Sequence, residues 1–378
     1  MLLKTTFIAV ALALAGSAGA QEVIKIGHVG PISGAIAHLG KDNENGARMA
    51  IEDLNAEHFK INGKAVKFEL VAEDDAADPK QGTAVAQKLV DAKVNGVIGH
   101  LNSGTTVPAS KIYFDAGIPQ ISPSATTPQY TKQNFNTAFR VVANDNKLGG
   151  TLGAYAVDTL HAKKIAVIDD RTAYGQGVAE EFIKGAKAKM PGVQLVDKEF
   201  TNANATDFNA ILTTIKAKQP DLIFFGGMDA VAGPMLRQMK ALGITAKFMG
   251  GDGICTEALA TLAGDGIGNG TLTCAEAGGV PADQQKGMDD FHARYKKKYN
   301  MEVQLYAPYV YDAVMTMATA MQNAKSADPA KYLPELAKIK YKGITGPIAF
   351  DKYGDIKDGA LTLFTFKDGK KTKIAVIK

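Results

Sequence analysis

Short runs rich in β-branched residues alternate with longer amphipathic stretches along nearly the whole chain. Residues 23–29 have the composition of a buried strand, and residues 43–55 place Ala, Ile and Leu on one face of a helix. The same alternation predicts further strands at 66–72, 96–101 and 119–122, and further helices at 79–92 and 107–116. Strands joined by crossover helices predict a parallel sheet with helices on its faces.

A second run of this alternation follows a strand at 139–142. Its expected elements are helices at 148–160, 177–189, 207–217 and 234–242 and strands at 164–168, 193–200, 222–226 and 247–249. The last expected elements are helices at 281–299 and 307–323, a strand at 347–350 and a hairpin over 361–377. A chain of 378 residues can form two domains of roughly 150 residues each. The sequence therefore predicts two doubly wound α/β lobes with a ligand cleft between them.

The first twenty residues have the pattern of a secretory signal peptide. Lys4 precedes an apolar run over 7–15, and small residues follow as far as Ala20. The apolar run is much shorter than the roughly 20 residues that a membrane anchor needs. We therefore expect cleavage after Ala20 and export of the mature chain from the cytoplasm.

Cys255 and Cys274 are the two cysteines of the chain and lie 19 positions apart. An exported protein meets an oxidising compartment, which favours one disulfide over two free thiols. Such a bond would stabilise the fold by about 3 kcal/mol through the loop that it closes. Metal binding would need more ligands at short spacing, so we expect no metal site.

Charge and motif content exclude several classes of function. Lys and Arg number 43, Asp and Glu number 39, and the two signs are interspersed, which argues against a nucleic-acid-binding surface. The sequence lacks the common hydrolase, zinc-protease and phosphate-loop motifs, and its six histidines are scattered singly. The segment Tyr174-Gly175-Gln176-Gly177 lacks the third glycine of a dinucleotide motif. We expect neither an enzyme nor a cofactor.

Two hydroxyl-rich loops follow neighbouring strands of the first lobe. One contains Asn102 and Ser103, and the other contains Ser124 and Thr126. Because Pro108 predicts a helix start nearby, free backbone N–H groups and a helix dipole could hold an anion at the first loop. Plain helix capping explains the same residues.

The second lobe offers the opposite charge. Asp252 stands between glycines directly after the strand at 247–249, where it is either a turn residue or a partner for an ammonium group. Tyr174 is either a packed loop aromatic or part of a cleft wall.

Six separated segments resemble, in order, those of periplasmic branched-chain amino-acid-binding proteins, the leucine/isoleucine/valine type of bacterial ABC importers. They are Gly30-Pro31-Ile32-Ser33-Gly34, Asp74-Asp75-Ala76-Ala77-Asp78-Pro79-Lys80-Gln81, Ile98-Gly99-His100-Leu101-Asn102-Ser103, Ile121-Ser122-Pro123-Ser124-Ala125-Thr126, Tyr174-Gly175-Gln176-Gly177 and Phe248-Met249-Gly250-Gly251-Asp252-Gly253.

The resemblance implies a type I periplasmic-binding fold, an α/β fold of two lobes with doubly wound parallel sheets joined by three hinge crossings. We expect the crossings near Val142, Glu276 and Phe350. The first lobe then comprises residues 21–141 and 277–350, and the second comprises residues 142–276 and 351–378.

The resemblance also implies the roles of the site residues. Ser103 and Thr126 would hold the ligand's carboxylate, Ser124 would help to hold the ammonium, and Asp252 would replace the family's glutamate as the acidic partner. The expected site is completed by the loop neighbours and by the side-chain pocket, which are Asn102, Ala125, Leu39, Leu101, Tyr174, Met228 and Tyr306. Leu39 and Met228 stand where leucine-preferring members have tyrosine. The family's first-lobe disulfide is missing, since Ala77 and Asn102 occupy its positions.

The sequence thus predicts a monomeric periplasmic protein that closes over a branched-chain or other aliphatic amino acid and delivers it to the membrane subunits of an ABC permease. One alternative keeps the fold and binds phenylalanine, another neutral amino acid, an amide or a short-chain acid. A second role, presentation of the ligand to a sensor, would use the same cleft. The distant alternative is an α/β enzyme.

Overall fold

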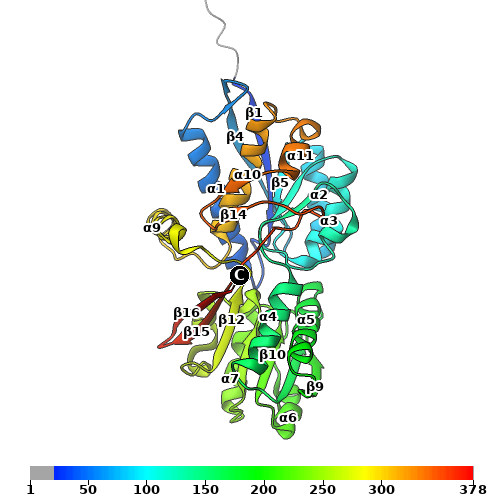
Figure 1. The fold of residues 1–378 in the computed structure, drawn as a ribbon, viewed down its shortest axis with the longest axis vertical. Coiled ribbons are helices and arrows are strands. Elements are labelled where there is room, and N and C mark those ends of the chain that lie inside the picture. The colour runs from blue at the N-terminus through cyan, green and yellow to red at the C-terminus, as the bar shows by residue number, and fades with distance from the viewer. Residues whose placement is uncertain (1–20, 378) are drawn as a thin grey trace, which may run out of the picture.

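The computed structural model describes residues 21–377, so the expected signal peptide at 1–20 lies outside the described residues. Two sheets, each covered by helices, lie one after the other along the long axis of the molecule (Figure 1). We call each sheet with the helices packed on it a lobe. In residues 21–377, no helix is both long and apolar enough to cross a bilayer.

The first lobe contains an entirely parallel sheet with the order β4-β1-β5-β6-β7. Alternate residues of β1 face opposite sides: Ile24 and Ile26 join the core under α1 and α10, whereas Val29 joins the core under α2 and α3. The elements of this lobe are β1 (Val23–Gly30), α1 (Ala37–Ala56), β2 (Lys60–Ile61), β3 (Lys64–Ala65), β4 (Lys67–Asp74), α2 (Pro79–Asp91), β5 (Gly96–Gly99), α3 (Ser103–Asp115), β6 (Gln120–Ser122), β7 (Ala138–Arg140), α9 (Gln285–Tyr299), α10 (Ala307–Asn323), α11 (Pro329–Ala337), β13 (Tyr341–Lys342) and β14 (Pro347–Ile348).

The second lobe contains a mixed sheet with the order β16-β15-β12-β11-β10-β8-β9. Its strands from β8 to β12 are parallel, but the terminal hairpin β15–β16 adds to β12 in the antiparallel direction, which departs from the purely parallel sheet expected. A tight turn joins the two hairpin strands, so they cannot run parallel. The elements are α4 (Asp145–Asp158), β8 (Lys164–Asp169), α5 (Ala173–Lys189), β9 (Gln194–Phe200), α6 (Asn209–Lys218), β10 (Leu222–Gly226), α7 (Asp229–Ala241), β11 (Lys247–Gly250), α8 (Ala258–Ala263), β12 (Leu272–Glu276), β15 (Leu361–Lys367) and β16 (Lys370–Ile377).

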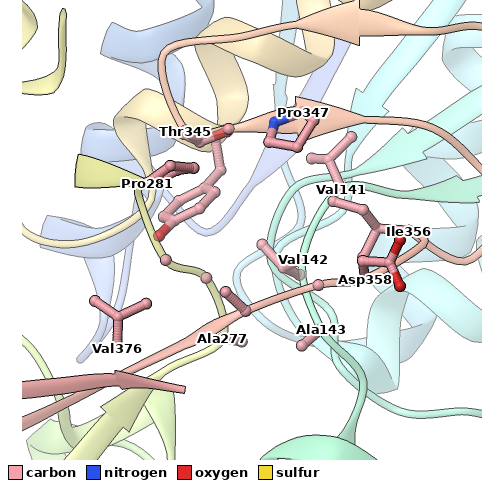
Figure 2. Close-up of a pocket in the computed structure, with 16 residues that line it drawn as sticks. Val141, Val142, Ala143, Ala277, Pro281, Thr345, Pro347, Ile356, Asp358 and Val376 are labelled. Carbon is pink, nitrogen blue, oxygen red and sulfur yellow. The ribbon is translucent and has the colours of Figure 1, made fainter. Parts of the chain in front are cut away.

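The chain passes between the lobes three times: after β7, after β12, and between β14 and β15. The first two crossings run side by side, because the backbone N–H of Ala143 donates to the carbonyl of Ala277 at 2.7 Å. Figure 2 shows Val142 and Ala277 from these crossings and Ile356 from the third around a common pocket. Because three chain segments connect the lobes here, the lobes can move relative to each other only by bending about this region.

Several helices begin earlier than the sequence predicts. α3 begins at Ser103 and α7 at Asp229, whereas the predicted starts were 107 and 234. Pro108 and Pro234 lie inside these helices, where each removes only one backbone donor, so reading them as first-turn prolines was wrong. α5 likewise begins at Ala173, which places Tyr174 in its first turn rather than in a loop. These corrections bring candidate site residues to helix N-termini.

Other differences are local. β12 was not predicted, because the run Leu272–Glu276 has only one large aliphatic residue. The predicted strand at 347–350 is reduced to β14, which pairs with β13 in a small separate sheet. The Cα atoms of Cys255 and Cys274 lie 5.3 Å apart with their Sγ atoms within bonding distance, and both residues are buried in the second lobe.

Candidate functional site

The loops at the facing ends of the two sheets line a small, partly open cavity of about 10 Å³. Eight of the eleven predicted ligand residues line it, namely Leu101, Asn102, Ser103, Ser124, Tyr174, Met228, Asp252 and Tyr306. The other three are buried outside this lining: Leu39 in the main hydrophobic core, and Ala125 and Thr126 in the same loop as Ser124. The structure therefore brings residues from both lobes around one space.

The N-terminus of α3 forms one side of the cavity. Asn102 is the N-cap residue with extended backbone angles, and its side-chain oxygen is buried without a hydrogen-bond partner among residues 21–377. The hydroxyl of Ser103 accepts a hydrogen bond from the backbone N–H of Thr127 at 3.3 Å. The first-turn N–H groups of a helix and its dipole favour an anion at this point.

A buried arginine fixes the neighbouring loop over 123–127. Arg140 donates to the carbonyl oxygens of Ala125 at 3.1 Å and Thr127 at 2.7 Å, and it forms an ion pair with Asp355 of the third crossing. From the other side, the hydroxyl of Ser122 accepts from the N–H of Ala125 at 3.0 Å. The loop is therefore held in shape without its own hydroxyls. In the described part of the chain, the Ser124 hydroxyl is buried and unpartnered, which leaves it available for a ligand.

Asp252 forms the opposite side of the cavity. It lies directly after β11 and is 1% exposed. Its glycine neighbours are required for packing: a Cβ at Gly251 would lie 2.6 Å from the Tyr174 hydroxyl, and one at Gly253 would lie 2.8 Å from the sulfur of Met228. The Tyr174 hydroxyl accepts from the Gly253 N–H at 2.9 Å. The glycines thus allow an aromatic ring and a thioether to form the wall beside the acid.

Tyr306 reaches across from the first lobe and donates its hydroxyl to Asp252 at 2.9 Å. Its position is set by Asp42 of α1, whose buried carboxylate accepts the backbone N–H groups at the start of α10, those of Gln304, Leu305, Tyr306 and Ala307. The second carboxylate oxygen of Asp252 is buried and finds no partner within residues 21–377. One oxygen of the acid is thus held, and the other is left without a protein partner.

Burial makes this acid unusual. Burial raises the pKa of Asp252 to about 6, although the hydroxyls of Tyr174 and Tyr306 oppose the rise. Burial also raises the pKa of Asp145 to about 8, the Asp252 charge adds to this rise, and the Thr126 hydroxyl opposes it. A cationic group between the lobes would stabilise the ionised form of both acids.

Sequence reasoning missed Asp145 and Asp42. Asp145 is the first residue of α4, and its backbone N–H donates to the carbonyl of Thr126 at 2.8 Å, so it links the two lobes beside the cavity. The available signal was the pair Asn144-Asp145 ahead of an apolar helix, which resembles an ordinary cap. Asp42 carried no local signal, because its partners lie more than 260 residues away in the sequence.

The geometry combines an anion-accepting helix end with a buried acid across a small cavity. Among residues 21–377, no group of three or more His, Cys, Asp or Glu side chains is placed to hold a metal ion.

A family profile described as periplasmic binding protein matches residues 23–371 of this chain. The chain belongs to the periplasmic binding protein family. Proteins of this family bind solutes and are not enzymes, and the periplasmic binding protein described here shares their two-lobed type I fold.

Individual relatives agree with this family assignment. This periplasmic binding protein is 37% identical to the Leu/Ile/Val-binding protein homolog 1 of Brucella abortus, with 99% of each chain covered. It superposes on a leucine binding protein from Thermotoga maritima with a TM-score of 0.84, 26% identity and coverage of 94% of this chain and 98% of the other. The branched-chain amino acid binding protein of Streptococcus pneumoniae, in complex with isoleucine, gives a TM-score of 0.82 at 29% identity, with 94% and 99% covered.

Proposed function

We propose that this protein captures a neutral aliphatic amino acid, with branched-chain amino acids as the preferred ligands, and delivers it to an ABC import permease. The observation that carries the proposal is the pairing of a buried acid, Asp252, with the helix end at Ser103 across one cavity. An amino acid is a zwitterion whose two charged groups match these two sides. The names of the relatives, which bind leucine, isoleucine or valine, support the same ligand class.

In this proposal the first lobe binds the ligand before the cleft closes. The hydroxyls and backbone N–H groups around Ser103 and Thr126 donate hydrogen bonds to the carboxylate, and backbone groups of Ser124 help to hold the ammonium group. Closure then brings Asp252 and Tyr174 onto the ligand and excludes water, which strengthens the charged contacts. The permease recognises the closed form. The lobe boundaries at 21–141 with 277–350 and at 142–276 with 351–378 belong to this proposal, as do cleavage after Ala20, a monomeric state and oxidation of Cys255 and Cys274.

The side chain of the ligand would contact Leu101 and Met228, with Leu39 behind them. Burial of a leucine side chain contributes about 1.5–3 kcal/mol, so leucine should bind roughly 10- to 150-fold more tightly than glycine. The expected affinity for leucine is near micromolar, about −8 kcal/mol.

Titration calorimetry on protein that has been unfolded, stripped of ligand and refolded tests the proposal. Leucine, isoleucine and valine should each release heat of binding. The decarboxylated and the deaminated analogues of leucine, which each keep only one of its two charged groups, should not. Strong binding of phenylalanine with none of the aliphatic amino acids would change the ligand class. Absence of binding to every amino acid would refute the proposal. Mass spectrometry of molecules that co-purify with the native protein identifies the physiological ligand.

A further inference from the structure

A histidine and an aspartate form a further side-chain contact across the cleft, separate from the pair Tyr306 and Asp252. The Nε2 atom of His38 lies 2.7 Å from a carboxylate oxygen of Asp229. His38 is in the first turn of α1, in the first lobe, and Asp229 is the first residue of α7, in the second lobe. The contact therefore exists only when the lobes are closed.

This contact lies next to the ligand cavity on both sides. His38 precedes Leu39, a predicted pocket residue, and Asp229 follows Met228, which lines the cavity as the N-cap of α7. Any movement that separates His38 from Asp229 also moves the Met228 wall away from the first lobe. The pair is thus mechanically coupled to the site without touching the ligand.

The two partners differ in exposure to solvent. The Asp229 side chain is fully buried, and the oxygen that faces His38 also accepts the hydroxyl of Thr256 at 2.6 Å. The His38 side chain is 28% exposed, so it can exchange protons with solvent while the cleft is closed.

The charged groups that act on His38 are Asp229 of α7 and Asp42 of α1. Burial alone lowers the pKa of His38, but the hydrogen bond and charge of Asp229, together with the charge of Asp42, raise it above its ordinary value. In an open cleft His38 loses Asp229 and its pKa returns toward the ordinary value, about 6.5. The closed form therefore binds a proton on His38 more tightly than the open form.

We propose that His38 and Asp229 form a latch that stabilises the closed form, and hence ligand binding, increasingly as the pH falls from slightly alkaline to slightly acidic. The effect of the latch on ligand affinity rests on the proposed function, whereas its effect on lobe closure does not. Because the raised pKa belongs to a histidine, the contribution of the latch is complete below the open-form pKa and is lost as the pH rises through the closed-form pKa. A partly exposed pair of this kind shifts the equilibrium about two- to fivefold.

Two other acids of the cleft titrate in the same range. Burial raises the pKa of Asp252 to about 6 and that of Asp145 to about 8, so protonation of these acids also favours the closed, ligand-free cleft, whereas the proposed contact with the ligand's ammonium group needs Asp252 ionised. The latch must therefore be measured as the difference between the wild type and His38→Gln. Glutamine retains a hydrogen-bond donor for Asp229 and removes the titratable group. His161→Gln, at an exposed position, is the matched control.

Lobe closure can be followed without ligand by single-molecule energy transfer between dyes on Ala35→Cys and Ala203→Cys. Both positions are exposed and follow the carboxyl ends of strands, β1 and β9, at the cleft rims. Near pH 8 the wild type, His161→Gln and His38→Gln should have similar closed fractions. Near pH 6 the wild type and His161→Gln should each favour the closed form about two- to fivefold more than His38→Gln does. Equal closed fractions of wild type and His38→Gln at both pH values would overturn the latch.

Leucine affinity gives a second readout. The dissociation constant of His38→Gln should exceed that of the wild type about two- to fivefold near pH 6, and the two should converge near pH 8. A ratio that is constant with pH in a protein that binds leucine rejects the latch and leaves the proposed function intact. Absence of leucine binding, with a closed fraction that differs between the wild type and His38→Gln near pH 6 but not near pH 8, rejects the proposed function and supports the latch. Thermal melting of both variants checks that they fold.

Discussion

Replacement of Asp252 with asparagine removes the negative charge from the cavity and retains the size and shape of the side chain. The amide oxygen can still accept the Tyr306 hydroxyl, so the contact between the lobes at 2.9 Å is preserved. What is lost is the charged hydrogen bond to the ligand's ammonium group. A hydrogen bond to a charged group contributes about 2 kcal/mol, so leucine should bind roughly 30-fold more weakly to Asp252→Asn.

The ligand-free protein should respond in the opposite direction. The rise of the Asp252 pKa from 3.8 to about 6 means that the ionised acid costs about 3 kcal/mol in the closed, empty cleft. Because the pKa is raised, this cost is complete above about pH 6 and disappears below about pH 4, where the carboxyl is protonated in both folded and unfolded chains. Asp252→Asn removes the cost. Opening of the cleft hydrates the acid, so 3 kcal/mol is the upper bound of the gain in unfolding free energy.

Calorimetry with leucine between about pH 5 and 8 and urea unfolding without ligand measure the two effects. Wild-type affinity for leucine should fall as the pH drops below about 6, where Asp252 takes up a proton. We call this fall the acid limb of the affinity profile, and Asp252→Asn should lack it. Asp265→Asn, on the exposed surface of the same lobe, is the control and should match the wild type. Unchanged affinity of Asp252→Asn for leucine, with the acid limb retained, would refute the assignment of Asp252 as the ammonium partner.

Three further variants test separate parts of the structure. Tyr306→Phe removes a donor from Asp252, which should raise the pKa of the acid further and move the acid limb of the calorimetric affinity profile to higher pH. Ser103→Ala should weaken leucine binding roughly fivefold through loss of about 1 kcal/mol, and an unchanged titration would exclude the hydroxyl from the site. Joint replacement of Cys255 and Cys274 by serine should lower the unfolding free energy by about 3 kcal/mol in urea, whereas equal stability would mean that the thiols are free in the native protein.

Much of the fold was accessible from the sequence, because periodicity is a local property. The helix over 307–323 and the strand over 222–226 agree with α10 and β10 at both ends. The predicted starts of α3 and α7 were wrong, because a proline suits both the first turn and a later position at little cost, and the sequence does not distinguish the two. The antiparallel addition of β15 to β12 depended on which sheet edge the terminal hairpin would meet.

The sequence by itself determined the alternation of strands and helices, and therefore the strand ends that Ser103, Tyr174 and Asp252 follow. Only the tertiary structure decided which distant groups meet: Asp42 with the N–H of Tyr306 inside the first lobe, 264 residues apart, and His38 with Asp229 across the two lobes, 191 residues apart. The contact across the lobes depends on how the lobes pack about their hinge, and burial between them alters the pKa of an acid that looks ordinary in the sequence. Local sequence patterns predict the short-range conformation of the chain but not how the lobes pack.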